Sequence, residues 1–159
     1  MIKVLFICHG NICRSPMAES ILKHLASING LTAFLYIDSA ATSTEEIGNG
    51  VHYGTRNILG KKGVPCAEHR ARQMTRRDYE EYNYLIGMDD ANIRNMMRIV
   101  GGDPKHKMYK LLEFAESGRA IADPWYTGDF DTTYADVEEG CKALLKYLQE
   151  NCHFESLGD

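Results

Sequence analysis

Residues 2–16 read IKVLFICHGNICRSP, and this stretch decides the fold. Its first part, from Ile2 to Ile7, is an apolar run that is typical of a strand buried on both faces of a parallel sheet. The residues from Cys8 to Cys13 then predict a loop. Ser15 and Pro16 predict the N-cap and the first position of a helix. The stretch therefore predicts a strand–loop–helix unit.

Strands and helices alternate through the rest of the chain. Further strands are predicted at 34–37, 84–88 and 108–112, and helices at 51–61, 75–81, 90–100 and over a last periodic segment. The last helix shows apolar residues at a helical period: Tyr134, Val137, Cys141, Leu144, Leu145 and Leu148. Such alternation predicts right-handed crossovers and a parallel sheet covered on both faces. We expect an α/β fold, with one three-layer domain over residues 1–159 and a four-stranded parallel sheet flanked by helices.

Composition narrows the classes of partner. Apolar residues make up 44% and charged residues 25% of the 159 residues, and the formal net charge is −4. This balance argues against a surface that coats nucleic acid or an anionic membrane, but it allows a small anionic substrate if positive charge is local. No stretch approaches the roughly 20 apolar residues that cross a bilayer, and no targeting segment is expected.

Cysteine usage indicates the compartment. The five cysteines are odd in number and irregularly spaced: Cys8, Cys13, Cys66, Cys141 and Cys152. Together with the missing secretion signal, this predicts reduced thiols and a cytoplasmic protein. Because no C-x-x-C or H-x-x-x-H motif is present, no structural zinc site is expected.

The loop after the first strand carries a C-x5-R pattern from Cys8 to Arg14. The pattern alone is weak, but its place between a buried strand and a helix N-terminus predicts an anion cradle of backbone N–H groups. Arg14 adds a planar fork that binds two oxygens of a phosphate. The positive field favours the thiolate of Cys8, to which Ser15 can donate a hydrogen bond. The alternative is a buried core thiol at Cys8 and a solvated arginine.

Two loop residues suit this conformation. Gly10 allows backbone geometry that is closed to bulkier residues, and Asn11 tolerates the left-handed region. The amide of Asn11 can also fix the loop. We therefore expect the loop to keep one phosphate-binding shape.

An acid is needed to protonate the leaving oxygen. The best candidate is Asp123, in the stretch Asp123-Pro124-Trp125-Tyr126. Pro124 would stiffen the backbone, and Trp125 and Tyr126 could line a slot for a ring substrate. Asp-Pro also commonly opens a turn, and Trp125 could belong to the core. The residues alone leave both interpretations open.

Together these segments resemble the low-molecular-weight protein tyrosine phosphatases. The resemblance covers nearly the whole chain through matches at 4–8, 10–19, 38–43, 69–73, 88–89 and 123–124. It implies a Rossmann-like fold of the phosphatase-I type. It also implies hydrolysis of protein phosphotyrosine and small aryl phosphates through a phosphocysteine intermediate, without metal or organic cofactor.

The resemblance assigns roles to individual residues. Cys8 would be the nucleophile, Arg14 would bind phosphate and stabilise the transition state, and Asp123 would act as acid and then as base. The phosphate-binding loop would comprise His9, Gly10, Asn11, Ile12, Cys13 and Arg14, and a supporting network Asn11, Ser15, Ser39 and His69. Cys13 would protect the nucleophile from oxidation by forming a disulfide with it. Without the resemblance, His69 would be a surface residue and Cys13 a small buried one.

Two departures from the family pattern affect the pocket wall. Many members place an aromatic or apolar side chain where this chain has Thr44-Glu45-Glu46, so the wall at Glu45 is expected to be acidic and to disfavour acidic phosphopeptides. Many members also have two tyrosines where this chain has Trp125-Tyr126. The implied partners are tyrosine-phosphorylated proteins and a tyrosine kinase, with phosphate and other oxyanions as inhibitors, and no nucleic acid or membrane.

Other functions were weighed against this one. Arsenate reductases share the fold and the loop but use a close mid-chain cysteine pair, whereas Cys66, Cys141 and Cys152 are widely spaced. Phosphoarginine phosphatases resemble the loop but carry Thr where this chain has Ile12. A phosphocysteine phosphoryl carrier, or a silent phosphotyrosine-binding module, has no use for a leaving-group acid at Asp123.

Overall fold

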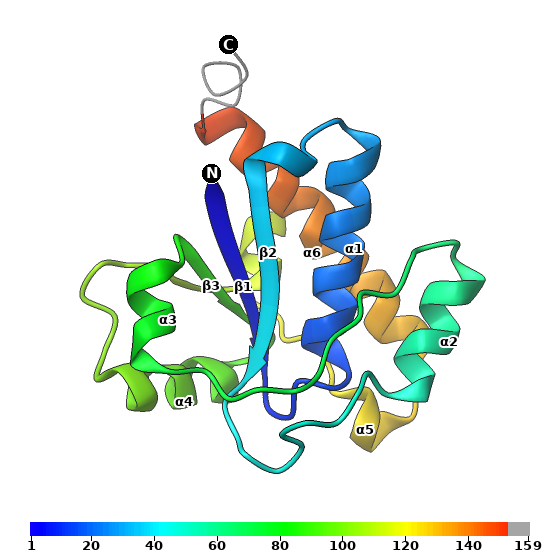
Figure 1. Cartoon of the computed structure of the whole chain (residues 1–159), viewed down its shortest axis with the longest axis horizontal. Coiled ribbons are helices and arrows are strands. Elements are labelled where there is room, and N and C mark those ends of the chain that lie inside the picture. Colours follow the sequence, from blue (N-terminus) through cyan, green and yellow to red (C-terminus); the bar gives the residue numbers. More distant parts are fainter. Residues whose placement is uncertain (153–159) are drawn as a thin grey trace.

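A four-stranded parallel sheet forms the centre of the molecule. The computed structural model describes residues 1–152. Strand β1 (Ile2–Cys8) pairs with β2 (Leu35–Ala41) on one side and with β3 (Tyr84–Gly87) on the other, and β4 (Met108–Lys110) pairs with β3. The strand order is therefore β2-β1-β3-β4 (Figure 1). This sheet confirms the predicted α/β class and strand number.

Helices cover both faces of the sheet. Helices α1 (Arg14–Ile28), α2 (Tyr53–Lys61) and α6 (Phe130–Asn151) lie on one side of it in Figure 1, and α3 (Arg76–Glu81) and α4 (Asp90–Val100) lie on the other. The result is the predicted arrangement of three layers. The last residues of the predicted domain, 153–159, lie outside the described residues.

The side chains of β1 alternate between the two layers. Val4, Phe6 and Cys8 pack in the cluster that includes α1 and α6, whereas Leu5 and Ile7 pack in the cluster of the opposite face. Because both faces are covered, almost every side chain of the strand is apolar. Each large apolar side chain that is fully buried stabilises the fold by about 1.5–3 kcal/mol. Cys8 thus ends a strand that is anchored on both sides.

Most predicted boundaries are confirmed. Helix α4 has the predicted bounds, and α3 begins with a capping box formed by Thr75 and Asp78. Strand β2 starts later than predicted and continues to Ala41, because its polar residues Asp38 and Ser39 still pair with β1. Strand β4 ends at Lys110, where the 3₁₀ turn η2 (Leu111–Ala115) begins. A second 3₁₀ turn, η1 (Thr32–Phe34), and α5 (Pro124–Thr127) were not predicted.

The predicted start of the first helix is wrong by two residues. Cys13, not Ser15, occupies the N-cap position of α1, and no side chain caps the helix there. Ser15 is completely buried inside the first turn, where its hydroxyl contacts Cys8 and Asn11. Ser15 therefore stabilises the loop that follows β1 and does not cap the helix.

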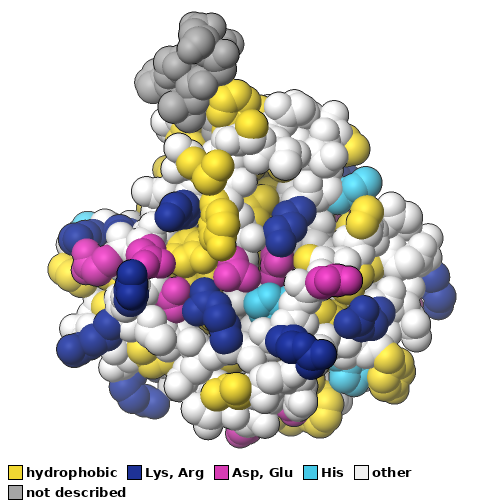
Figure 2. All heavy atoms as spheres, in the orientation of Figure 1, with side chains coloured by type: hydrophobic (Ala, Val, Ile, Leu, Met, Phe, Trp, Pro, Cys, Tyr) yellow, Lys and Arg dark blue, Asp and Glu magenta, His cyan; other side chains and the backbone are white. Residues whose placement is uncertain are grey.

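The carboxyl ends of the parallel strands meet at one edge of the sheet, at the bottom of Figure 1. The N-terminus and the end of α6 lie at the opposite edge. Over residues 1–152, no helix combines the length and the apolar character needed to cross a bilayer. On the face drawn in Figure 2, basic and acidic side chains are interspersed rather than gathered in one basic patch.

Candidate active site

Cys8 ends β1 with its sulfur pointed at hydrogen-bond donors. The residue is 3% exposed, and its Sγ lies 3.0 Å from Ser15 Oγ. The backbone N–H of Asn11 donates to the same sulfur over 3.3 Å. Asn11 reaches this position with a φ of 62°, in the left-handed region that was expected for it. Two hydrogen-bonding groups, the Ser15 hydroxyl and the Asn11 N–H, therefore meet at the Cys8 sulfur.

Asn11 holds the loop through its side-chain amide. Its Nδ2 donates to Ser15 Oγ over 2.8 Å and to Ser39 Oγ over 3.0 Å. Its Oδ1 lies 2.6 Å from His69 Nε2 and accepts from the N–H of Arg72. The structure thus brings together Asn11, Ser15, Ser39 and His69, which the family resemblance had grouped. The network fixes the loop beneath Cys8.

Glu19 extends this network and was not predicted as a site residue. It is 2% exposed and accepts a hydrogen bond of 2.6 Å from Ser39 Oγ, while His69 Nδ1 lies 3.5 Å from the same carboxylate oxygen. The other oxygen pairs with Lys23 Nζ over 2.6 Å. A signal was present in the sequence, because Glu19 stands four residues after Ser15 and hence on the same face of α1.

Among the described residues, Glu19, Asp38 and His69 form a group that could hold a cation. One ligand atom each of Glu19, Asp38 and His69 lie within 4.8 Å of one another. Protein partners already engage these groups, since Ser39 and Lys23 bind Glu19 and Arg72 Nη2 lies 3.4 Å from Asp38. The cluster therefore acts as a support for His69 and carries no metal assignment.

Arg14 is a buried cation held by three groups. It is 2% exposed, and its Nη1 donates to Asp89 Oδ2 over 2.7 Å and to Ile121 O over 2.9 Å. Its Nη2 lies 3.6 Å from Asp123 Oδ2. Burial lowers the pKa of the guanidinium, but the negative charges of Cys8, Asp89 and Asp123 outweigh it and raise the pKa overall. Arg14 is thus charged at any working pH.

Two features of Arg14 were not predicted. Asp89, which follows β3, is the N-cap of α4 and accepts a hydrogen bond that orients Arg14, a pairing that was not predicted. The Nε of Arg14 is one of two buried side-chain polar atoms without a hydrogen-bond partner among the described residues. Because an unpaired buried donor is costly, this N–H favours an oxygen acceptor in the loop.

Asp123 both opens a turn and faces the loop. Its Oδ1 accepts from the N–H of Trp125 over 3.0 Å as the N-cap of α5, and its Oδ2 is the oxygen near Arg14. The two interpretations of Asp-Pro are therefore compatible. The turn leaves Trp125 57% and Tyr126 81% exposed. Trp125 is consequently not a core residue.

Loop, turn and acidic wall enclose one cavity of about 90 Å³, which we call the slot. The slot is lined by Cys8, His9, Gly10, Asn11, Ile12, Cys13, Glu45, Glu46, Asp123, Trp125 and Tyr126. Glu45 lies at its mouth, with Oε2 3.0 Å from His9 Nε2. Glu46 joins the wall, so the acidic character expected there is built from two carboxylates.

Cys13 lines the slot but differs chemically from Cys8. It is 4% exposed, and no side chain within residues 1–152 hydrogen-bonds to its sulfur. Burial and, second, the negative charge of Cys8 raise the pKa of Cys13 to about 12. Cys13 is therefore a neutral thiol near pH 7.

Comparisons with known proteins identify the family of this chain. The family model for low molecular weight phosphotyrosine protein phosphatases matches residues 3–154. The chain is 38% identical over 152 residues to the low molecular weight protein-tyrosine-phosphatase YfkJ of Bacillus subtilis, covering 94% of this chain and 97% of the relative. It is also 38% identical over 148 residues to the low molecular weight phosphotyrosine protein phosphatase of Rattus norvegicus, covering 90% and 93%.

Solved structures show the same relationship. The crystal structure of YfkJ superposes with a TM-score of 0.91 at 39% identity, over 94% of this chain and 96% of that one. An arginine phosphatase from Drosophila shares the fold, with a TM-score of 0.84 at 28% identity over 95% and 100% of the two chains. Since the family model spans nearly all of the described sheet and loops, this chain belongs to the low molecular weight phosphotyrosine protein phosphatase family.

Proposed function

We propose that this protein hydrolyses phosphotyrosine and small aryl phosphates through a phosphocysteine intermediate on Cys8. One observation carries the proposal. The buried Cys8 sulfur, the carboxylate of Asp123 and the positive charge of Arg14, with its unpaired Nε, converge on the slot and its immediate lining. Nucleophile, acid and oxyanion-binding groups are then within reach of one phosphoryl group.

In the first step, the Cys8 thiolate attacks phosphorus opposite the leaving oxygen. The S–P bond forms while the P–O bond to the aryl group breaks. Asp123, in its protonated form, transfers its proton to the leaving phenolate. The bond from Trp125 N–H to Oδ1 keeps this carboxyl group aimed from the α5 turn. The products are phosphocysteine and the free phenol.

In the second step, water replaces the thiolate. The Asp123 carboxylate takes a proton from water as the oxygen attacks phosphorus, and the S–P bond breaks to release phosphate. Ser15 and the N–H of Asn11 stabilise the departing Cys8 thiolate. Cys8 returns to its starting state, and Asp123 is protonated for the next cycle.

Transition-state charge falls on the equatorial phosphoryl oxygens. The N–H groups of the loop and the guanidinium of Arg14 are positioned to receive them. Asp89 and the Ile121 carbonyl fix the guanidinium, so no reorganisation is needed during the reaction. Removing one such preorganised donor typically costs about 10²–10³ in rate.

The mouth of the slot suggests the substrate class. Trp125 and Tyr126 offer aromatic surface to a phenyl ring, and Glu45 and Glu46 should disfavour acidic residues on their side of a phosphopeptide. We therefore propose tyrosine-phosphorylated proteins as substrates and a tyrosine kinase as the opposing enzyme, with oxyanions as inhibitors. A cytoplasmic location stays a prediction from cysteine usage.

The alternatives find less support. None of Cys66, Cys141 and Cys152 lines the slot, which leaves a disulfide relay for arsenate reduction without a third cysteine beside the loop. Ile12, rather than the threonine of phosphoarginine phosphatases, faces the slot. A phosphoryl carrier would not need Asp123 to face the loop.

Rapid-quench kinetics with p-nitrophenyl phosphate tests the proposal. We expect a burst of nitrophenol that is unchanged by EDTA in the wild type and absent in Cys8→Ser. Vanadate or phosphate should still bind the Cys8→Ser variant, since Arg14 and the loop remain. Full turnover by Cys8→Ser would remove Cys8 from the mechanism, and stable phosphoprotein without release of phosphate would favour a carrier.

A further inference from the structure

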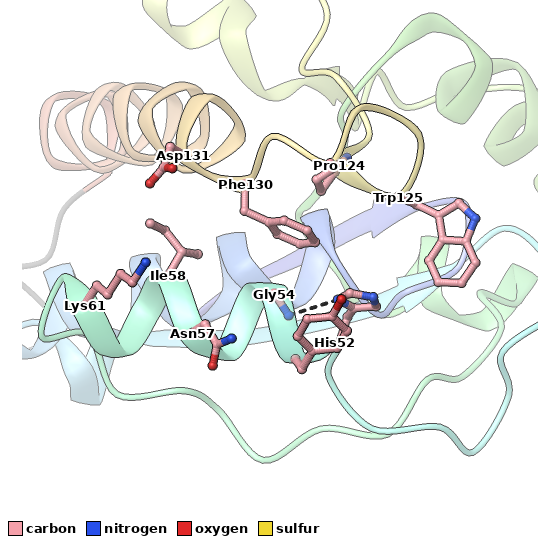
Figure 3. Close-up of a pocket in the computed structure, with 11 residues that line it drawn as sticks. His52, Gly54, Asn57, Ile58, Lys61, Pro124, Trp125, Phe130 and Asp131 are labelled. Carbon is pink, nitrogen blue, oxygen red and sulfur yellow. Dashed lines mark hydrogen bonds between the residues drawn. The ribbon is translucent and has the colours of Figure 1, made fainter.

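A second, wider cleft adjoins the slot. It has a volume of about 460 Å³, against about 90 Å³ for the slot. It lies between α2 and the segment that links α5 to α6 (Figure 3). Trp125 lines both the cleft and the slot, and it stands at one end of the cleft in Figure 3. The two spaces therefore lie on either side of this ring, which forms their shared wall.

Aromatic rings form the floor of the cleft. Phe130 lies so close to Gly54 that any side chain there would collide with the ring. The Phe130 ring stacks against His52 with centroids 5.3 Å apart, and His52 also stacks on Tyr53 at 4.4 Å and meets the edge of Trp125 at 5.7 Å. His52 Nδ1 accepts from Gly54 N–H over 3.0 Å, which fixes its ring (Figure 3).

The rings around this floor stay in water. Tyr53 is 72% exposed, and Trp125, which lines both spaces, is 57% exposed; Tyr126, which lines only the slot, is 81% exposed. Contiguous exposed aromatic surface is typical of binding sites, because it gains free energy only when a partner covers it. At the far end, Asn57, Lys61 and Asp131 line the cleft, and none of their side chains pairs with another described residue. An aromatic floor with a polar rim matches the anatomy of a recognition surface.

We propose that this cleft is a substrate subsite that takes an aromatic or other large apolar side chain near the phosphotyrosine of a peptide. The inference rests on the proposed function, because the occupant is the same polypeptide whose phosphotyrosine enters the slot. Such a chain must pass Trp125, the wall that both spaces share. The polar rim then serves the N–H and C=O groups of the peptide backbone.

The length of α2 limits where that side chain stands. From Tyr53 to Lys61 the helix rises about 12 Å, at roughly 1.5 Å per residue. An extended peptide covers this span with about four residues, at roughly 3.3 Å each. The subsite thus binds the side chain of a residue within about four positions of the phosphotyrosine, on one side of it.

Phosphopeptides with a single phenylalanine test the subsite. Each peptide carries one Phe at one to four positions before or after phosphotyrosine in an alanine and serine background, and the matched peptide carries Ala there. We expect kcat/KM to be roughly 5–20-fold higher for Phe at one position on one side. Asn57→Trp, which fills the cleft, should bring this ratio close to one. Lys62→Trp, at the end of α2 outside the lining, should keep it.

Two results would overturn the subsite: equal kcat/KM for every peptide, or a Phe preference that survives Asn57→Trp. If Asn57→Trp does not fold, as judged by circular dichroism, Tyr53→Ala takes its place, because it removes an exposed wall of the cleft and should also lower the ratio. Hydrolysis of p-nitrophenyl phosphate separates the two levels of the account. If the wild type cleaves p-nitrophenyl phosphate but shows no Phe preference, the subsite alone is refuted. If it cleaves neither this compound nor any peptide, the proposed function is refuted.

Discussion

The floor and the mouth of the slot are built in opposite ways. At the floor, Asn11, Ser15 and Ser39 are at most 1% exposed and hydrogen-bond to one another. At the mouth, Trp125 and Tyr126 are more than half exposed, and Glu45 reaches the wall with a side chain that is 69% exposed. The difference indicates that the chemistry depends on a rigid, buried framework, whereas substrate choice depends on surface side chains that can change without disturbing it.

Asp123 lies between the floor and the mouth. Its substitution should lower kcat more than any of the other substitutions below. Asp123→Ala should lower kcat by about 10²–10⁴ for phosphotyrosine, whose phenolate needs a proton, but much less for p-nitrophenyl phosphate. The measurement is kcat across a series of aryl phosphates of increasing leaving-group pKa. An equal loss over the whole series would contradict an acid at the mouth.

Asn11→Ala tests the floor. Because it leaves Ser15, Ser39 and His69 short of partners, we expect a loss of about 1–3 kcal/mol in the free energy of unfolding, together with lower kcat. Urea unfolding and kcat for p-nitrophenyl phosphate measure the two effects. Asn95→Ala is the matched control, since Asn95 only accepts one bond from Arg98 on α4. Wild-type values for both quantities in Asn11→Ala would show that the network is dispensable.

The raised pKa of Cys13 predicts how fast it forms a disulfide with Cys8 after oxidation. Peroxide should convert the Cys8 thiolate to a sulfenic acid, and the Cys13 thiolate should then attack that sulfur, forming the disulfide and releasing the hydroxyl group as water. Because the pKa of Cys13 is raised to about 12, its thiolate fraction, and hence the rate of disulfide formation, should increase about tenfold per pH unit in the neutral range.

The rate is followed by loss of free thiols after a peroxide pulse at several pH values. Cys13→Ser should lose activity irreversibly, whereas the wild type should recover with a reducing agent. Equal recovery of both proteins would remove the protective role of Cys13.

A charge reversal in the acidic wall should have the smallest effect on catalysis of these substitutions. Glu45→Lys should raise kcat/KM for acidic phosphopeptides by about two- to five-fold relative to neutral ones, because exposed charge pairs contribute about 0.2–1 kcal/mol. Glu150→Lys, near the end of α6 and far from the slot, carries the same charge change as a control. The effect should shrink at high salt. A change that both variants share would come from net charge rather than from the wall.

Residues of both the floor and the mouth could be predicted from the sequence, since Glu45, Trp125 and Tyr126 line the slot as expected, but contacts between distant segments could not. The buried strand, Gly10, Asn11 and Arg14 are adjacent in the chain, so local rules place them together. Asp89 pairs with Arg14 from 75 residues away, and no local pattern reports such a partner. Helix α5 has four residues, which is too short for a helical period, and the adjoining cleft forms only when α2 meets the start of α6.

The most direct test of the central claim is the location of the phosphoryl group during turnover. Wild-type protein is mixed with p-nitrophenyl phosphate, quenched within the burst, digested and mapped by mass spectrometry under conditions that preserve S–P bonds. The account predicts one phosphoryl group on the peptide that contains Cys8, and none on the same peptide from Cys8→Ser. A phosphoryl group on His9 or His69, or turnover without any phosphoprotein, would contradict it.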